Sequence, residues 1–180
     1  MARASSNPAC DGLGTGAFDT ASSFTIGAIN TTLPNANITG APIVVNSAGA
    51  FSDLSVWHLG TWAQYSYPLE YTSIALVNGT LVITGDGAKP ARADTVDAGN
   101  SLEWASLNDG SSVPTDGAQI YCAVSPPGNQ GSPILAVNGD TDSFSLCQTS
   151  FENVVYYKAA PDRGYDFDSC YPVKLQLNFF

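Results

Sequence analysis

The sequence contains little positive charge. Its 180 residues include six lysines and arginines against sixteen aspartates and glutamates, so the formal net charge is −10 at pH 7. Such a chain is repelled by nucleic-acid phosphates and by anionic lipids. No apolar run approaches the roughly 18 residues that a membrane span requires. Nucleic acids and membranes are therefore not expected partners.

Histidine is almost absent as well, since His58 is the only one. A Ser-His-Asp site would have to be built around it, and no G-x-S-x-G nucleophile motif accompanies it. The same scarcity argues against a zinc site with several histidine ligands. We interpret His58 as a structural or surface histidine. The sequence predicts no catalytic residue, no cofactor and no metal, and hence a protein that is not an enzyme.

Four cysteines are present, and none of them forms a C-x-x-C pair. Even numbers of widely spaced cysteines are typical of disulfides rather than of metal or redox sites. Two disulfides are expected, and three pairings are possible. We favour Cys147 with Cys170 and Cys10 with Cys122, because the first pair closes a short loop that is rich in turn residues.

Three N-glycosylation sequons accompany the cysteines. They begin at Asn30, Asn37 and Asn78, and each ends in threonine. A glycan cannot be buried, so each asparagine should lie on an exposed loop or turn. Together with the cysteines, the sequons predict a secreted, extracellular glycoprotein.

Helical periodicity is missing throughout. Residues 1–20 show no periodicity of any kind and predict an irregular N-terminal arm tied down by Cys10. From residue 21 to residue 180, short β-branched or aromatic runs alternate with clusters of Gly, Pro, Asn and Asp, which is typical of an all-β domain. We expect a single compact domain of about ten to twelve short antiparallel strands. A trefoil-like barrel and a two-sheet sandwich both fit this pattern.

Three segments follow the pattern of a β-hairpin. The clearest runs from Ile74–Val77 through Asn78-Gly79 to Thr80–Ile83, because Asn-Gly supplies the two positive-φ positions of a type I′ turn. A second would join residues 134–137 to residues 143–146. A third, fainter one follows residues 42–45 with a turn at residues 46–49. Further strands are expected at Phe24–Ile29, Leu54–Leu59, Ile120–Val124, Val154–Tyr157 and Val173–Phe179.

The segment 56–71 concentrates aromatic residues. Exposed rings of this kind could stack on sugar faces, in which case Trp57 and Trp62, or Tyr65 and Tyr67, would be the carbohydrate-binding residues. Large aromatic rings also dominate burial in β domains. We favour the core interpretation over the carbohydrate-binding one.

Two acidic pairs, Asp140 with Asp142 and Asp166 with Asp168, could supply oxygen ligands to calcium or the two carboxylates of a glycosidase. Neither pair follows the Asp-x-Asp-x-Asx-Gly pattern of a calcium loop. Aspartates that cap turns explain both pairs better.

The C-terminal third carries a family resemblance. The segments Phe144-Ser-Leu-Cys147, Asn153-Val-Val-Tyr156 and Cys170-Tyr-Pro-Val173, followed by an alternating strand, resemble fungal secreted proteins related to the cell-wall protein PhiA, in particular the mushroom members. The stretch from Ala41 to Phe51 is similar to the opening strand and turn of that family. The resemblance implies a wall-associated fungal glycoprotein without catalytic residues. It also implies a structural bridge between Cys147 and Cys170.

Three functions therefore compete. The first is a non-enzymatic secreted protein of the fungal wall or extracellular space that binds polysaccharide. The second is a lectin-like, immunomodulatory protein that acts on animal immune cells through surface glycans. The third and least favoured is a glycoside hydrolase that uses an acidic pair.

Overall fold

The computed structural model describes residues 7–61, 70–107 and 116–180. Within these residues the chain is all β apart from two 3-10 helices. The 3-10 helices are η1 (Pro8–Cys10) and η3 (Pro127–Asn129). The strands are β1 (Ala17–Phe18), β2 (Ala21–Asn30), β3 (Ala41–Phe51), β4 (Leu54–Thr61), β5 (Ser73–Val77), β6 (Thr80–Thr84), β7 (Ala91–Arg92), β8 (Glu103–Leu107), β9 (Tyr121–Val124), β10 (Ile134–Val137), β11 (Phe144–Gln148), β12 (Asn153–Tyr157) and β13 (Asp166–Phe179).

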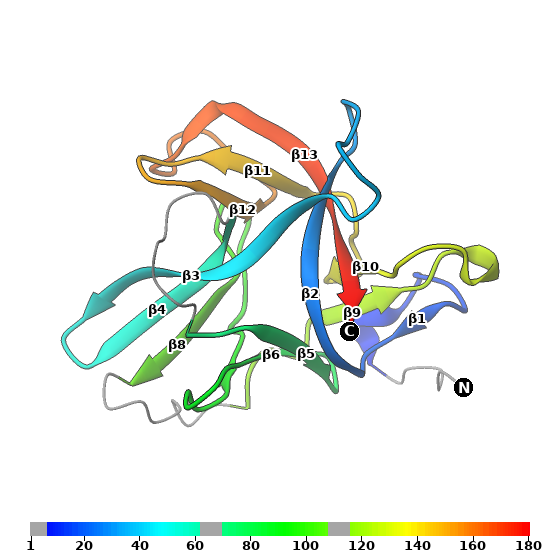
Figure 1. Ribbon diagram of the computed structural model, residues 1–180, viewed down its shortest axis with the longest axis horizontal. Helices are drawn as coiled ribbons and strands as arrows, with labels where there is room; N and C mark the ends of the chain where they lie inside the picture. The colour runs from blue at the N-terminus through cyan, green and yellow to red at the C-terminus, as the bar shows by residue number, and fades with distance from the viewer. Residues whose placement is uncertain (1–6, 62–69, 108–115) are drawn as a thin grey trace.

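Six of the strands form a closed barrel. Hydrogen bonding runs from β2 through β3, β4, β12 and β11 to β13, and the pairing of β13 with β2 closes the ring (Figure 1). Every pairing in this ring is antiparallel. The predicted all-β class and its many short antiparallel strands are confirmed.

Closure decides between the two architectures that the sequence left open. A sandwich has two separate sheets, whereas the described strands form one continuous sheet that returns on itself. The connectivity also differs from that of a β-trefoil, in which each of three repeats supplies two barrel strands. Here three barrel strands lie before residue 62 and three after residue 143.

The remaining strands extend the barrel wall outward. β5, β6 and β7 continue from β2, β10, β9 and β1 continue from β13, and β8 pairs with β4 (Figure 1). One edge of a long strand can pair with one strand near its start and with another strand near its end. β4 pairs with β12 at Gly60 and with β8 from Leu54 to His58.

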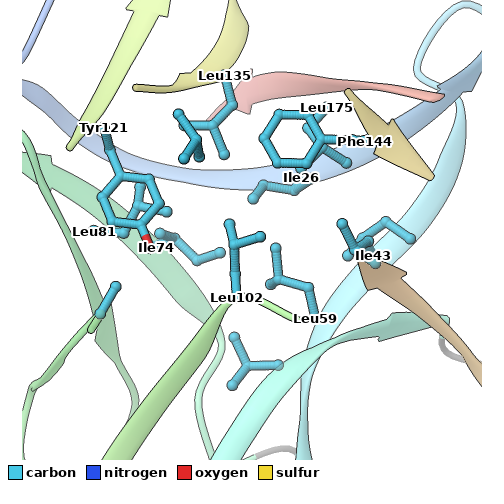
Figure 2. Packing of buried hydrophobic residues seen from close by; sticks show 14 of the residues in the cluster. Ile26, Ile43, Leu59, Ile74, Leu81, Leu102, Tyr121, Leu135, Phe144 and Leu175 are labelled. Carbon is cyan, nitrogen blue, oxygen red and sulfur yellow. The ribbon is translucent and has the colours of Figure 1, made fainter. Parts of the chain in front are cut away.

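The core lies inside this wall. Apolar side chains from the strands, including Ile26, Leu59, Leu135 and Leu175, converge on one interior with Leu102, which precedes β8 (Figure 2). Strand alternation places them there, since every second side chain of a strand points to the same face. In β13, Val173, Leu175 and Leu177 are buried while the residues between them are partly exposed. The strand predicted over Val173–Phe179 is confirmed, and its pairing with β2 closes the barrel.

The Asn78-Gly79 hairpin is also confirmed. β5 pairs with β6 from Ser73–Thr84 to Val77–Thr80, and Asn78 and Gly79 have φ of 48° and 78°. Positive φ at both central positions is what a type I′ turn requires.

The other two predicted hairpins are wrong. β3 does not turn at residues 46–49 but continues with a bulge to Phe51, and the chain reverses after it at Ser52, which has a φ of 35°. β10 does not pair with β11, because β13 lies between them. The Asn138-Gly139 turn is local, joining Val137 to Asp140, after which the chain leaves β10.

Two disulfides hold the wall together, with the pairing that we favoured. Cys10 is bonded to Cys122 on β9, and Cys147 on β11 is bonded to Cys170 on β13. The first attaches the N-terminal segment, which contains η1 and β1 and is thus less irregular than expected. Its sulfurs lie in a small second cluster with Ala17 and Ala136.

Among the described residues, no helix is long and apolar enough to cross a bilayer.

Candidate functional site

The outer face of β4 carries the polar residues of the candidate site. Leu59 points into the core and Trp57 packs against the core, so the side chains of Val56 and His58 project to the opposite face, on which Gly60 leaves a space. Asn46 on β3 and Glu103 on β8 are the register partners of His58. Polar side chains therefore form a row across three adjacent strands.

A buried carboxylate lies over this row. The side chain of Glu152 is 4% exposed, and its Oε1 lies 2.8 Å from Nε2 of His58, whose side chain is 13% exposed. Its Oε2 accepts a hydrogen bond from the side-chain amide of Asn46. Burial of a carboxylate is costly unless both oxygens have partners, and here both do. We call Asn46, His58 and Glu152 the polar clamp.

Gly60 makes room for the clamp. A Cβ at this position would lie 2.0 Å from Oε2 of Glu152, so only glycine allows the carboxylate to approach the backbone of β4. The turn before β12 orients the glutamate, because Thr149 donates to the Glu152 carbonyl and its hydroxyl accepts from the Glu152 N–H.

The clamp joins two barrel strands where their backbone pairing is short. The described pairing of β4 with β12 is the single register pair Gly60–Val154. Beyond it, β4 pairs with β8 instead. Side-chain hydrogen bonds from Glu152 to β3 and β4 therefore supplement a short stretch of the barrel wall.

An open hollow of about 180 Å³ lies next to the clamp, over β4 and β8. Its apolar lining comes from Val56, Trp104 and Ala105. Its polar lining comes from Asp94, Thr95, Asn100, Ser101 and Glu103. Within the hollow, the Ser101 hydroxyl donates to Glu103 at 2.7 Å. The Glu103 side chain is thus held at the boundary between the hollow and His58.

A pair of tyrosines borders the same region. The rings of Tyr156 and Tyr165 lie 3.9 Å apart between centroids and 31° from parallel. Tyr156 bridges to Ser101, and the Tyr165 hydroxyl donates to the carbonyl of Gly99. Burial, with the nearby Tyr165 phenol and the carboxylates of Glu103 and Glu152, raises the pKa of Tyr156 to about 12. Its hydroxyl is therefore a neutral donor at physiological pH.

The chemistry available here is that of hydrogen bonding. Nε2 of His58 is engaged by Glu152, and the carboxylate of Glu152 is shared with Asn46. Across the described ranges, no group of three or more His, Cys, Asp or Glu side chains is placed to hold a metal ion. The hollow offers carboxylate, hydroxyl and amide groups beside apolar side chains, which suits a small ligand that is itself amphipathic.

Of the four aromatic residues considered for carbohydrate binding, the structure describes Trp57. Trp57 is half-buried, stacks edge-to-face on Tyr71 at 5.0 Å, and donates its indole N–H to Ser106 at 3.0 Å. These contacts resemble those of a core residue. Trp62, Tyr65 and Tyr67 lie outside the described residues.

Two of the three sequons fall at the loop between β2 and β3. Asn37 is exposed within this loop, whereas Asn30 is the last residue of β2, is partly buried and pairs with Val173, so it does not occupy the exposed loop position that we expected. Thr31 to Thr39, between β2 and β3, are all exposed, and this loop projects from the barrel (Figure 1). In both sequons the Asn side-chain oxygen accepts from the N–H and the hydroxyl of the threonine two residues later, in Asn30 with Thr32 and in Asn37 with Thr39.

The third sequon is placed differently. Asn78 is exposed, but Thr80 is 2% exposed and Gly79 is buried. The Gly79 N–H donates to the carbonyl of Asp19, and its carbonyl accepts from Tyr121. The hairpin tip is therefore packed against the N-terminal segment and β9, while the Asn78 side chain faces solvent.

The two acidic pairs lie in different kinds of structure. The carboxylate of Asp140 accepts from the N–H groups of Asp142 and Ser143, and Asp142 forms an ion pair with Lys174 at 3.0 Å. The Asp168 N–H donates to the side chain of Asp166. The contacts of Asp140 favour the turn-cap interpretation for the first pair, whereas Asp166 and Asp168 lie at the start of strand β13.

Sequence reasoning missed most of the site. Glu152, Asn46, Glu103 and Tyr156 were not singled out. One signal was available for His58: strand alternation in Leu54–Thr61 places it opposite to Trp57 and Leu59. No signal in the sequence joins residue 58 to residue 152, because this contact depends on closure of the barrel.

Comparison with known proteins gives no relative. No protein-family model, no curated protein and no solved structure matches the chain.

Proposed function

We propose that this protein is a non-enzymatic extracellular glycoprotein that binds polysaccharide, in keeping with its resemblance to fungal wall proteins. The observation that carries the proposal is the state of the cysteines. All four are paired in two disulfides, one joining η1 to the outer strand β9 and the other joining the neighbouring barrel strands β11 and β13. Disulfides of this structural kind persist in oxidising compartments and are rare in reducing ones.

The sequon loop supports the same proposal. A glycan on Asn37 would extend from an exposed loop, and a glycan on Asn30 would be attached at the end of β2, where that loop begins. The bond from the threonine hydroxyl to the asparagine side chain places the two functional groups of each sequon together. Such a loop tolerates a large hydrophilic addition without loss of packing.

The first test is secretion from a eukaryotic host. The chain, preceded by a signal peptide, should appear in the medium with both disulfides formed and with a mass that falls on deglycosylation. Thr39→Ala should remove one glycan and Thr39→Ser should retain it, because serine preserves the sequon. A secreted chain that carries no glycan at any sequon would contradict the glycoprotein part.

The second test is polysaccharide binding. The purified protein is incubated with insoluble β-glucan, chitin and mannan, and the bound fraction is measured after washing. Retention on at least one of them is expected. Failure on all three, together with no hit on a glycan array, would overturn the binding part.

A further inference from the structure

We infer that the outer-face hollow beside the polar clamp is the polysaccharide contact site, and that it accepts one pyranose ring of a neutral or amino sugar. This inference rests on the proposed function. It assigns the binding to the outer face of β4 and β8 rather than to Trp57, whose ring packs against the core.

The size of the hollow limits the ligand. Its volume of about 180 Å³ lies below the ~300 Å³ at which pockets begin to hold drug-sized molecules. It is open to solvent along one side, so a single ring can enter while the rest of a chain continues outside. A polysaccharide presents such rings at its ends and along its length.

The lining matches the two kinds of surface on a pyranose. Val56 and Ala105, neighbours on β4 and β8, offer aliphatic contact for the C–H face of a ring. Asn100, Ser101 and Glu103 offer an amide, a hydroxyl and a carboxylate for ring hydroxyls. The hollow thus combines aliphatic contact with several convergent polar groups, and groups of the second kind fix orientation and specificity in small-ligand sites.

The charge of the lining selects among sugars. Asp94 and Glu103 are the charged residues that line the hollow, and as carboxylates they accept hydrogen bonds only. The ligand must therefore supply donors, as hydroxyl and ammonium groups do. A uronic acid would place a third carboxylate beside these two and be repelled, and the net charge of −10 adds to that repulsion.

The clamp makes the site preorganised. His58 is the register partner of Glu103, and it is held on its other side by Glu152. The β4 wall under the hollow is thus fixed by a buried hydrogen-bond network rather than by exposed side chains. Preorganisation of this kind lowers the entropy lost on binding.

Two variants test the site by different means. Ala105→Leu fills the hollow. Glu103→Gln keeps the shape of the hollow, removes one negative charge and replaces one acceptor oxygen by an amide group that donates hydrogen bonds. Ala50→Leu, on the exposed end of β3, and Asp86→Asn, on an exposed loop, are the matched controls for added volume and lost charge. Thermal unfolding of each variant checks that it is folded.

The probes are oligosaccharides of glucose, N-acetylglucosamine, glucosamine and galacturonic acid, titrated by calorimetry, together with the insoluble polysaccharides. We expect binding of at least one of the first three and none of the fourth. Ala105→Leu should weaken the binding at least tenfold and Glu103→Gln at least threefold, while both controls bind as the wild type does.

The outcomes distinguish failure of the assigned site from failure of the proposed function. If the wild type is retained on polysaccharide and folded Ala105→Leu is retained equally, the assignment of the hollow is overturned and the proposed function stands. Equal binding of the galacturonic acid oligomer would likewise overturn the assigned sugar class. If the wild type binds no probe at all, both proposals fall.

Discussion

The two faces of strand β4 are stabilised in different ways. On the inner face, Leu59 is fully buried among apolar side chains from many strands. On the outer face, His58 is held by directional bonds to Glu152, which also binds Asn46. Apolar burial depends on area and volume, whereas the clamp depends on particular partners at particular distances. The inner face should therefore tolerate changes of shape that preserve volume, and the outer face should not tolerate loss of one partner.

The largest effect is expected on the inner face. Leu59→Ala should lower the free energy of unfolding by about 2–5 kcal/mol, because it removes buried methyl groups and leaves a cavity. Leu59→Met, which preserves most of the volume, should cost less than about 1.5 kcal/mol. Urea denaturation with disulfides intact measures both. Equal costs for the two variants would contradict a core held mainly by volume and area.

Gly60→Ala should come next. The added methyl group would meet Oε2 of Glu152, so either the carboxylate or the β4 backbone must move, at about 1–3 kcal/mol. The double variant Gly60→Ala with Glu152→Ala should lose less stability than the sum of the two single variants. In the double variant no carboxylate is present for the added methyl group to meet. A double-mutant cycle gives the coupling. Strict additivity would mean that Glu152 does not occupy the space above Gly60.

Glu152→Gln should have a smaller effect, about 1–2 kcal/mol, because glutamine keeps the shape but loses the charge-assisted bonds to His58 and Asn46. Glu103→Gln, at an exposed position on the same face, is the control and should change stability by less than about 0.5 kcal/mol. Equal losses of stability for Glu152→Gln and Glu103→Gln would contradict the difference between the buried clamp and an exposed carboxylate.

The smallest effect concerns Tyr156 at alkaline pH. Its pKa is raised from 10.0 to about 12 in the folded chain, so the unfolded chain loses this proton first. The contribution of Tyr156 is thus fully present below pH 10 and is lost as the pH rises from about 10 to 12. Tyr156→Phe should make the decline in stability over this range less steep. An unchanged slope would place the phenol in solvent rather than beside Tyr165.

The elements of the fold were predictable where local chemistry determines them. Asn78-Gly79 forms the expected turn because its positive φ angles are a property of those two residues. The turn expected at residues 46–49 was wrong because Asn46 behaves as a strand residue there, with its side chain bound to Glu152. The polar character that suggested a turn is explained by a partner 106 residues away.

The pairing of strands was less predictable for the same reason. Residues 134–137 and 143–146 look like the two arms of a hairpin, and both are strands. β13 inserts between them, pairing with β10 and with β11, and it adds one alternating apolar face to the core. A local pattern specifies a strand, whereas its neighbour is decided by which arrangement buries most apolar surface.

The sequence by itself determined the class of structure, the number of possible disulfides and the positions of the sequons, because composition, strand periodicity and turn residues act over short distances. Only the tertiary structure decided that the wall closes into a barrel and that His58, Glu103, Glu152 and Tyr156 share one outer face. Closure brings together strands that are some 90 residues apart in the chain, as in the 94-residue separation of His58 from Glu152. No local property of either segment specifies that contact.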